Sequence, residues 1–417
     1  MNVLLTGGAG YIGSATAREF LNLGFRVIVY DNLSKGHKSA LPEEVIFIEG
    51  DISDKKKLKE IIFNYEINFV VHFAAYLEVA ESVYKPSKYF HNNVINTINL
   101  LEAMLESNLK NIVFSSSAAV YGNPKRVPIT EDFEKSPTSP YGESKILMEN
   151  VLEEFVDKYN FNAIALRYFN AAGAVEGCGE DHDPETHIIP RFIKSVLVGD
   201  DITIFGDGSH RRDYVHVKDL AKAHVFSVLW MKEQTLVRSN GFFEAFNIGA
   251  GKMYTNLEMA NKIIELVFKS RGYESGSRII YLSERPGDPK DLMASNDKAK
   301  KYLNWDSEKS NLDEIISDAL NWHLNYKNGF HEENKFYEKS YLEIVDEIIY
   351  FLRICSSVSK NFKMKFIGML IKDEINSVSI NNKKFMNNDE ILNFIEKEFK
   401  LKNEVFNVLL EELKNYV

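Results

Sequence analysis

Pairs of tyrosine and lysine four residues apart are the residues of this chain whose types and spacing most directly suggest chemistry. A tyrosine can take the proton of a carbinol during hydride transfer if a nearby cation stabilises its phenolate. On a helix, the spacing Tyr-x-x-x-Lys places both groups on one face, one turn apart. Four such pairs occur: Tyr84/Lys88, Tyr121/Lys125, Tyr141/Lys145 and Tyr214/Lys218.

Only one of the four pairs is expected to open a helix. Pro86 and Pro124 interrupt the first two pairs, and the fourth, Tyr-Val-His-Val-Lys, alternates as a strand does. Ser139 and Pro140 precede the third pair and fit the N-cap and first position of a helix. The sequence therefore predicts that Tyr141 is the catalytic base. A serine of the upstream cluster Ser115–Ser117 could share its proton network, although strand-end amides would account for two of the three serines.

A glycine-rich turn predicts a dinucleotide site near the start of the chain. Thr6-Gly-Gly-Ala-Gly-Tyr-Ile-Gly follows an apolar run and precedes a helical pattern, so Gly7, Gly10 and Gly13 would bring backbone N–H groups against a pyrophosphate. Asp31 ends the next apolar run, where a carboxylate accepts ribose hydroxyls and repels a 2′-phosphate. This favours NAD over NADP. Later strand ends carry small or polar residues that either approach the cofactor or only end a strand: Asp51, Ile52, Phe73, Ala74 and Ala75.

The elements that must position these groups alternate between short apolar runs and helical patterns. Apolar runs near 3–5, 27–30, 45–48, 69–73, 112–114 and 163–166 are typical of buried parallel strands, with helices expected near 11–23, 54–65, 91–108 and 141–159. The sequence predicts an α/β fold, a Rossmann-like doubly wound parallel sheet, over residues 1–170. Parts of 214–250 are expected to return to it, and 171–330 to form a smaller α/β substrate lobe. Residues 331–417 are expected to form a helical C-terminal appendage of unknown role.

Composition narrows the class of protein. The chain of 417 residues has a net charge of −10, which gives no reason to expect a nucleic-acid partner. Its two cysteines, Cys178 and Cys355, cannot build a disulfide framework or a four-ligand zinc site, and we expect no metal ion. No leader segment and no apolar run long enough for a membrane span is apparent. A cytoplasmic enzyme without a membrane partner is the simplest expectation.

The motifs together resemble the UDP-glucose (UDP-galactose) 4-epimerases of the extended short-chain dehydrogenase/reductase family. The resemblance covers roughly residues 1–330 and lies in TGGAGYIG, DNLSKGH, GDI, VHFAA, ESV, NNV, FSSSAAVYG, SPYGESK, RYFNAAGA, RRDYVHVKDLA and ERPGDP. It implies that the catalytic residues are Ser117, Tyr141 and Lys145. It implies that NAD is held, beside the glycines, by Tyr11, Ile12, Asp31, Asn32, Asp51, Ile52, Phe73, Asn92, Lys145 and Phe169.

The same resemblance implies a substrate site and a mechanism. The sugar nucleotide would meet Ser117, Tyr141, Asn170, His187, Ile204, Phe205, Arg212, Arg285, Asp288 and Leu292. The hexose would be oxidised at C4, turn within the pocket and be reduced on its other face by resident NAD. The resemblance also implies a homodimer. Two positions depart from the pattern: Leu77 stands where many epimerases carry lysine, and Leu292, smaller than tyrosine at the sugar gate, leaves room for an N-acetyl group.

Alternatives remain on the same fold. Sister dehydratases and decarboxylases carry an acidic residue before Val-Tyr-Gly, where this chain has Ala118 and Ala119, so elimination lacks its acid. A pentose epimerase, or an NAD-binding sensor without catalysis, would use the same scaffold. The sensor hypothesis conflicts with the presence of both the Tyr/Lys pair and the substrate arginines.

Overall fold

The computed structural model describes residues 1–182, 185–272, 276–283, 289–326 and 329–330. The expected helical appendage 331–417 lies outside the described residues. Arg285 and Asp288, two of the residues expected to bind the sugar nucleotide, also lie outside them. Met1–Phe330 forms one compact unit. No helix among the described residues is both long and apolar enough to cross a membrane.

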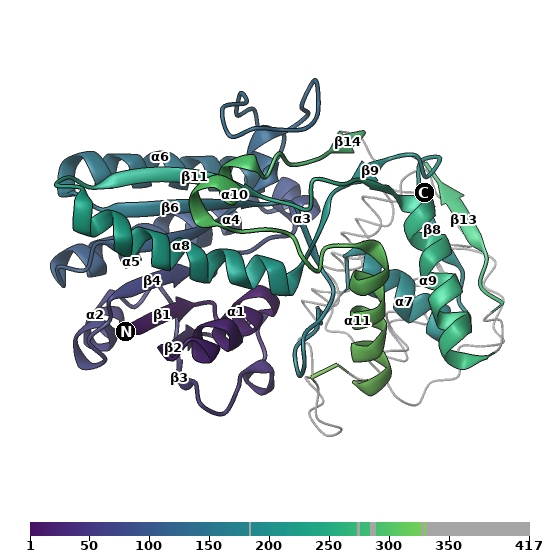
Figure 1. The fold of residues 1–417 in the computed structure, drawn as a ribbon, viewed down its shortest axis with the longest axis horizontal. Helices are drawn as coiled ribbons and strands as arrows, with labels where there is room; N and C mark the ends of the chain where they lie inside the picture. Colours follow the sequence, from purple (N-terminus) through teal and green to yellow (C-terminus); the bar gives the residue numbers. More distant parts are fainter. Residues whose placement is uncertain (183–184, 273–275, 284–288, 327–328, 331–417) are drawn as a thin grey trace, which may run out of the picture. The chain divides into compact units, whose positions relative to one another are not determined.

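A seven-stranded sheet is the centre of this unit, with strand order β11-β6-β5-β4-β1-β2-β3 (Figure 1). All neighbouring strands run parallel. The strands are β1 (Asn2–Thr6), β2 (Arg26–Asp31), β3 (Ile46–Glu49), β4 (Phe69–His72), β5 (Asn111–Ser117), β6 (Asn162–Tyr168) and β11 (Phe242–Ile248). The doubly wound parallel sheet predicted from the apolar runs is therefore confirmed.

Helices cover both faces of the sheet, which explains why its strands are apolar on both sides. On one face the core includes Phe20 of α1 (Tyr11–Asn22), Leu220 of α8 (Val217–Val237) and Leu303 of α10 (Asp297–Leu303). On the other face it includes side chains of α2 (Lys55–Asn64), α5 (Asn96–Glu106) and α6 (Pro140–Tyr159). The remaining elements on this part of the chain are short: η1 (Lys38–Ala40), α3 (Val79–Tyr84), α4 (Pro86–Phe90), the π-helix η2 (His91–Ile95) and η3 (Ala118–Tyr121).

Two elements return to the sheet after the chain has left it. Helix α8 packs against α1, and β11 pairs with β6 along its whole length. Trp305, nearly fully buried, donates its indole N–H to the carbonyl oxygen of Asp219 at 2.7 Å and so fastens the segment after α10 to the start of α8.

A separate hydrophobic core marks a smaller lobe, which consists of α7 (Ile188–Val198), α9 (Asn256–Arg271), α11 (Leu312–Asn325) and the strands beside them. Strand β8 (Ile202–Phe205) pairs with β13 (Ile279–Leu282). Strand β9 (Arg211–Arg212) lies between β12 (Tyr254–Thr255) and β14 (Asp291–Leu292). Strands β7 (Asn170–Ala172) and β10 (Tyr214–His216) pair where the chain passes between the two parts.

The order of the strands fixes where a ligand can bind. The chain builds outward from β1 to β2 and β3, then crosses to β4 on the other side of β1. In such a sheet, ligands bind at the carboxyl ends of the strands at this reversal. The glycine turn after β1 and the segment after β4 both lie at that point.

Candidate active site

Helix α6 presents Tyr141 and Lys145 in its first turns. The Ser139 side chain accepts a hydrogen bond from the Gly142 backbone N–H at 3.2 Å, and Pro140 begins the helix. The four-residue spacing brings the Lys145 Nζ atom 5.7 Å from the centre of the Tyr141 ring. The predicted helix start, N-cap and pairing of these two side chains are all present.

Lys145 is a buried cation with few partners. Its Nζ donates to the Ser115 carbonyl oxygen at 2.8 Å, and the residue is 3% exposed. Burial lowers the pKa of Lys145 to about 7, although the carboxylate of Glu149 acts in the opposite direction. The pKa of Lys145 is therefore close to neutral pH. Its ammonium group lies where it can stabilise the phenolate of Tyr141.

Ser117 connects β5 to the tyrosine. Its hydroxyl oxygen accepts from the Ala119 backbone N–H at 3.2 Å. Burial raises the pKa of Tyr141, and a hydrogen bond with Ser117 lowers it. Tyr141, Lys145 and Ser117 thus meet at the carboxyl end of β5.

The other two serines of the cluster have structural partners. Ser116 donates to Glu149 at 2.6 Å, and Ser115 forms a hydrogen bond with Tyr168 and supplies its carbonyl to Lys145. These partners are side chains, whereas the strand-end amide N–H of Ala119 is bound by Ser117. The prediction that strand-end amides account for two of the three serines is therefore wrong.

The remaining tyrosine–lysine pairs are arranged differently. Tyr84 ends α3 and is 45% exposed, and α4 begins after it at Pro86. Tyr121 is buried and donates to Asn247 at 2.7 Å. Tyr214 lies in β10 while Lys218 lies in α8, so this pair does not share a helix face.

The glycine turn after β1 is sterically fixed. Gly7 has φ +70°, and a Cβ added there would lie 2.4 Å from the Ala74 backbone nitrogen. A Cβ on Gly13 would lie 2.7 Å from the Gly8 Cα atom. Only glycine allows the ends of β1 and β4 and the start of α1 to approach this closely, with Gly10 at the N-cap.

Asp31 is tied to this turn. Its carboxylate accepts from the Ala9 N–H at 2.9 Å and from the Leu33 N–H at 2.8 Å. Burial raises the pKa of Asp31, and the two backbone hydrogen bonds lower it. Beside it, Asn32 donates to Asp51 at 2.6 Å across the next strand end.

The other residues expected to hold NAD lie around the same edge. Phe73 and Ala74 follow β4 and donate their backbone N–H groups to the Thr6 carbonyl at 2.8 and 3.0 Å. Asn92 lies in the π-helix and donates to Asn93 at 3.1 Å. Of the rest, Ile52 and Phe169 are buried, while Tyr11, Ile12 and Ala75 are partly buried.

Apart from Ser117 and Tyr141, the described residues that are expected to bind the substrate lie in the smaller lobe and in the chain passing to it. Asn170 in β7 donates to the Asp213 carbonyl at 3.0 Å, and His187 is the N-cap residue of α7. Ile204 is buried in the lobe core, so only its backbone could face a ligand, whereas Phe205 is partly buried.

Arg212 and Leu292 lie on the adjacent strands β9 and β14. Arg212 is 9% exposed and donates to the Arg211 carbonyl at 2.9 Å, while Arg211 itself pairs with Asp291 at 2.7 Å. Leu292 is partly buried and packs against a hydrophobic cluster that includes Ala118, Phe169 and Ala294. The expectation that Leu292 limits the size of the sugar stays a prediction.

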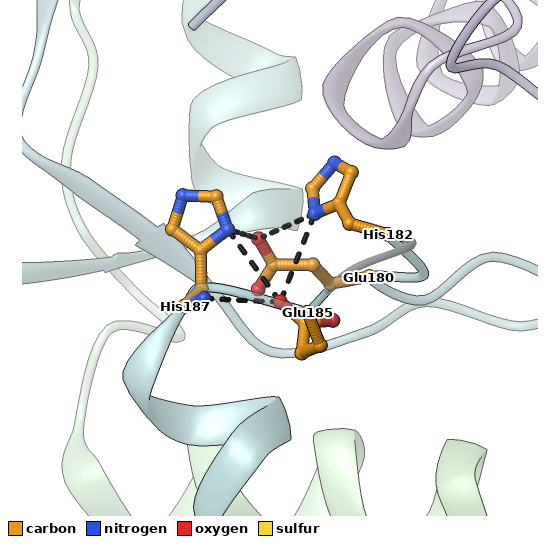
Figure 2. Close-up of side chains that lie close together, drawn as sticks. All are labelled: Glu180, His182, Glu185 and His187. Carbon is orange, nitrogen blue, oxygen red and sulfur yellow. Dashed lines mark hydrogen bonds and ion pairs between the residues drawn. The ribbon is translucent and has the colours of Figure 1, made fainter. Parts of the chain in front are cut away.

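The structure also gathers four residues of which sequence reasoning had singled out only His187. Glu180, His182, Glu185 and His187 each offer one ligand atom, and these atoms lie within 4.8 Å of one another (Figure 2). The expectation of no metal ion rested on the two cysteines and did not include histidine and glutamate as ligands. The spacing Glu-x-His-x-x-Glu-x-His was the signal available in the sequence.

Comparison with known proteins agrees with this geometry. Residues 3–249 match the family described as "NAD dependent epimerase/dehydratase family". The chain belongs to this family. It is 42% identical to the UDP-glucose 4-epimerase of Lactobacillus helveticus over 80% of this chain and the whole of that protein.

Two solved structures show the same fold. The Brucella ovis UDP-glucose 4-epimerase in complex with NAD is 39% identical, with a TM-score of 0.70 over 77% of this chain and 97% of that one. The Bifidobacterium longum enzyme in complex with NAD+ and UDP is 34% identical, with a TM-score of 0.71 over 79% and 100%.

The residues of this chain fit the family's cofactor. A turn that excludes any Cβ at Gly7, the N-terminus of α1 and the buried Asp31 carboxylate match a pyrophosphate and an adenosine ribose. The buried Lys145 contacts β5, the strand next to β4, through its hydrogen bond to the Ser115 carbonyl.

Proposed function

We propose that this protein is an NAD-dependent UDP-hexose 4-epimerase, an isomerase that acts through a 4-keto sugar. The observation that carries the proposal is the meeting of Tyr141, Lys145 and Ser117 beside the strand reversal, with alanine at the two following positions. A base without a neighbouring acid supports oxidation followed by re-reduction. Alanine at these two positions provides no acidic group for the elimination of water or the loss of carbon dioxide.

Each catalytic residue has a separate task. Tyr141 takes the C4 hydroxyl proton of the sugar and later returns it to the same oxygen. The Lys145 ammonium lowers the energy of the tyrosine phenolate, and Ser117 bridges the tyrosine and the sugar hydroxyl by hydrogen bonds. NAD, when bound, supplies the hydride acceptor and then the hydride donor.

We assign nucleotide binding to the smaller lobe. The guanidinium groups of Arg212 and Arg285 suit a diphosphate, and the carboxylate of Asp288 suits the paired hydroxyls of a ribose. His187, Asn170 and the backbone at Ile204–Phe205 complete the set. Because Leu292 is small, the proposal includes UDP-N-acetylhexosamines beside UDP-glucose and UDP-galactose.

We further propose a homodimer. Helix α6 and the segments α3 and η2 that pack against it carry exposed apolar side chains, namely Val79, Val83, Tyr84, Ile95 and Leu147, each 42–55% exposed, and Leu77 just before α3 is 41% exposed. Exposed apolar side chains on neighbouring helices support a protein–protein contact there. The low cysteine content and the buried Cys178 support a reducing cytoplasm as the compartment.

The test is conversion without added cofactor. Purified protein is incubated separately with UDP-galactose and with UDP-GlcNAc, and chromatography follows their 4-epimers. Conversion of UDP-galactose supports the proposal, and conversion of both supports the spacious sugar gate. Absence of conversion even with NAD supplied would refute the epimerase function for these sugars.

A further inference from the structure

The loop before α7 carries a compact group of nitrogen and oxygen donors apart from the tyrosine–lysine pair. Figure 2 shows Glu180, His182, Glu185 and His187 with their side chains pointing toward one another. Both glutamate side chains are 8% exposed and that of His182 is 15% exposed, whereas His187 is 41% exposed. The carboxylates are thus held away from water next to two imidazoles.

The distances within the group suit a tetrahedral cation. Two ligands about 2.0–2.1 Å from a zinc ion lie roughly 3.4 Å apart in a tetrahedron. The His187 Nδ1 atom lies 2.9 Å from Glu180 Oε1 and 3.7 Å from Glu185 Oε1. The His182 Nδ1 atom lies 3.6 and 3.9 Å from the same two oxygens. These four separations bracket the tetrahedral value, so small side-chain rotations would complete the geometry.

Three side-chain atoms of the group lack a well-oriented hydrogen-bond partner. The Nδ1 atoms of His182 and His187 and the Oε2 atom of Glu185 are buried without a hydrogen-bond partner. The His187 backbone N–H donates to Glu185 Oε1 at 3.0 Å. Burial lowers the pKa of His187, but the carboxylates of Glu180 and Glu185 raise it above its usual value, so without a metal ion a proton on His187 occupies the space between these groups. A metal cation would take the place of that proton.

The charge balance also fits a divalent ion. Metal binding requires neutral imidazoles, and the two carboxylates then leave a charge of about −2 on the group, which M²⁺ would neutralise. Lys194 is the cation facing the group, with Nζ 3.8 Å from both Glu185 Oε2 and Asp181 Oδ1. At that distance Lys194 forms only a loose ion pair with Glu185. Among the described residues, the ion pairs of Glu180 are with His182 and His187, and none is with a lysine or an arginine.

We propose that Glu180, His182, Glu185 and His187 form a binding site for a divalent transition-metal cation of the zinc type. Imidazole and carboxylate donors in a tetrahedral set suit zinc better than magnesium or calcium, which prefer all-oxygen shells. The ion would join the chain before α7 to the N-cap of that helix. It would bind His187 at Nδ1, leaving Nε2 as the ring nitrogen available to another ligand.

The experiment measures metal directly and does not depend on turnover. Full-length protein is stripped with a chelator, then titrated with Zn²⁺ by calorimetry and with Co²⁺ by visible absorption, which reports coordination geometry. The double variant His182→Ala/Glu185→Gln removes two ligands, and His91→Ala, an exposed histidine on η2, is the matched control. Circular dichroism checks that each variant is folded.

We expect about one Zn²⁺ more per chain in the wild type than in the double variant, with a dissociation constant below about 1 µM. We also expect a tetrahedral Co²⁺ spectrum in wild type and His91→Ala, and its loss in the double variant. Equal zinc uptake by wild type and folded double variant would overturn the proposal and leave the group as a set of ion pairs. Epimerase activity in the stripped protein would leave the proposed function standing in that event.

Discussion

The buried ion pair between Glu149 and Arg167 allows a sharp test of how the catalytic helix is anchored. The Arg167 guanidinium donates to both carboxylate oxygens of Glu149, at 2.9 and 2.7 Å, and the two residues are 1% and 0% exposed. Ser116 donates to the same carboxylate, and Arg167 also donates to Tyr121 at 2.7 Å. This network connects α6, which carries Tyr141 and Lys145, to β5 and β6.

The perturbation is Glu149→Gln, which keeps the shape of the side chain and removes its charge. Arg167 then remains buried without the carboxylate that it contacts directly. Breaking a buried pair from one side typically lowers the free energy of unfolding by about 3–5 kcal/mol. Replacing both partners, as Glu149→Met/Arg167→Met, removes both buried charges and is expected to lower stability less than the single change.

The assay is urea unfolding followed by tryptophan fluorescence, at one fixed NAD concentration for all variants. All three tryptophans, Trp230, Trp305 and Trp322, lie within Met1–Phe330, so the signal reports the unit that holds the site. Glu308→Gln, which breaks an exposed pair with Lys222, is the control and should leave the midpoint nearly unchanged. A loss for Glu149→Gln below about 1 kcal/mol would refute the argument that this pair anchors α6.

Three further predictions concern the site. Asp31→Ser should weaken NAD binding and reduce the preference for NAD over NADP, measured by fluorescence titration with both dinucleotides; an unchanged ratio would contradict the ribose assignment. Leu292→Tyr should slow epimerisation of UDP-GlcNAc more than that of UDP-glucose, compared by kcat/KM; equal slowing would count against the gate. The pKa of Lys145 is about 7 in the folded protein and 10.5 in the unfolded chain. Between pH 7 and pH 10.5 the unfolded chain therefore keeps a proton on Lys145 that the folded protein has lost. Stability should therefore rise with pH across this window more steeply in the wild type than in Lys145→Met; parallel curves would contradict this, and Lys158→Met, exposed on the same helix, should match the wild type.

Local patterns predicted most of the fold because each of its signals is short-range. The glycine turn, the Ser139–Pro140 helix start and the apolar runs depend on neighbouring residues, and the structure has each of them in place. The sequence also separated Tyr141 from the other tyrosines by the prolines and the strand alternation that accompany the rest.

What could not be predicted depends on residues far apart in the chain. The hydrogen bond from Tyr121 to Asn247 joins positions 126 residues apart, and no periodic pattern in the sequence predicts it. The partners of Arg167 likewise come from three separate segments. The donor cluster before α7 has a readable spacing, but its convergence depends on how the loop folds back on the helix N-terminus.

The central claim is that Tyr141 carries the proton at C4, and Tyr141→Phe tests it most directly. Steady-state turnover of UDP-galactose is measured together with the NAD content of the purified variant, and Tyr159→Phe, a 44% exposed tyrosine at the C-terminal end of the same helix, serves as the control. We predict a loss of turnover of about 10²–10⁴-fold for Tyr141→Phe, with NAD content unchanged and Tyr159→Phe fully active. Turnover of Tyr141→Phe close to that of the wild type would contradict the account.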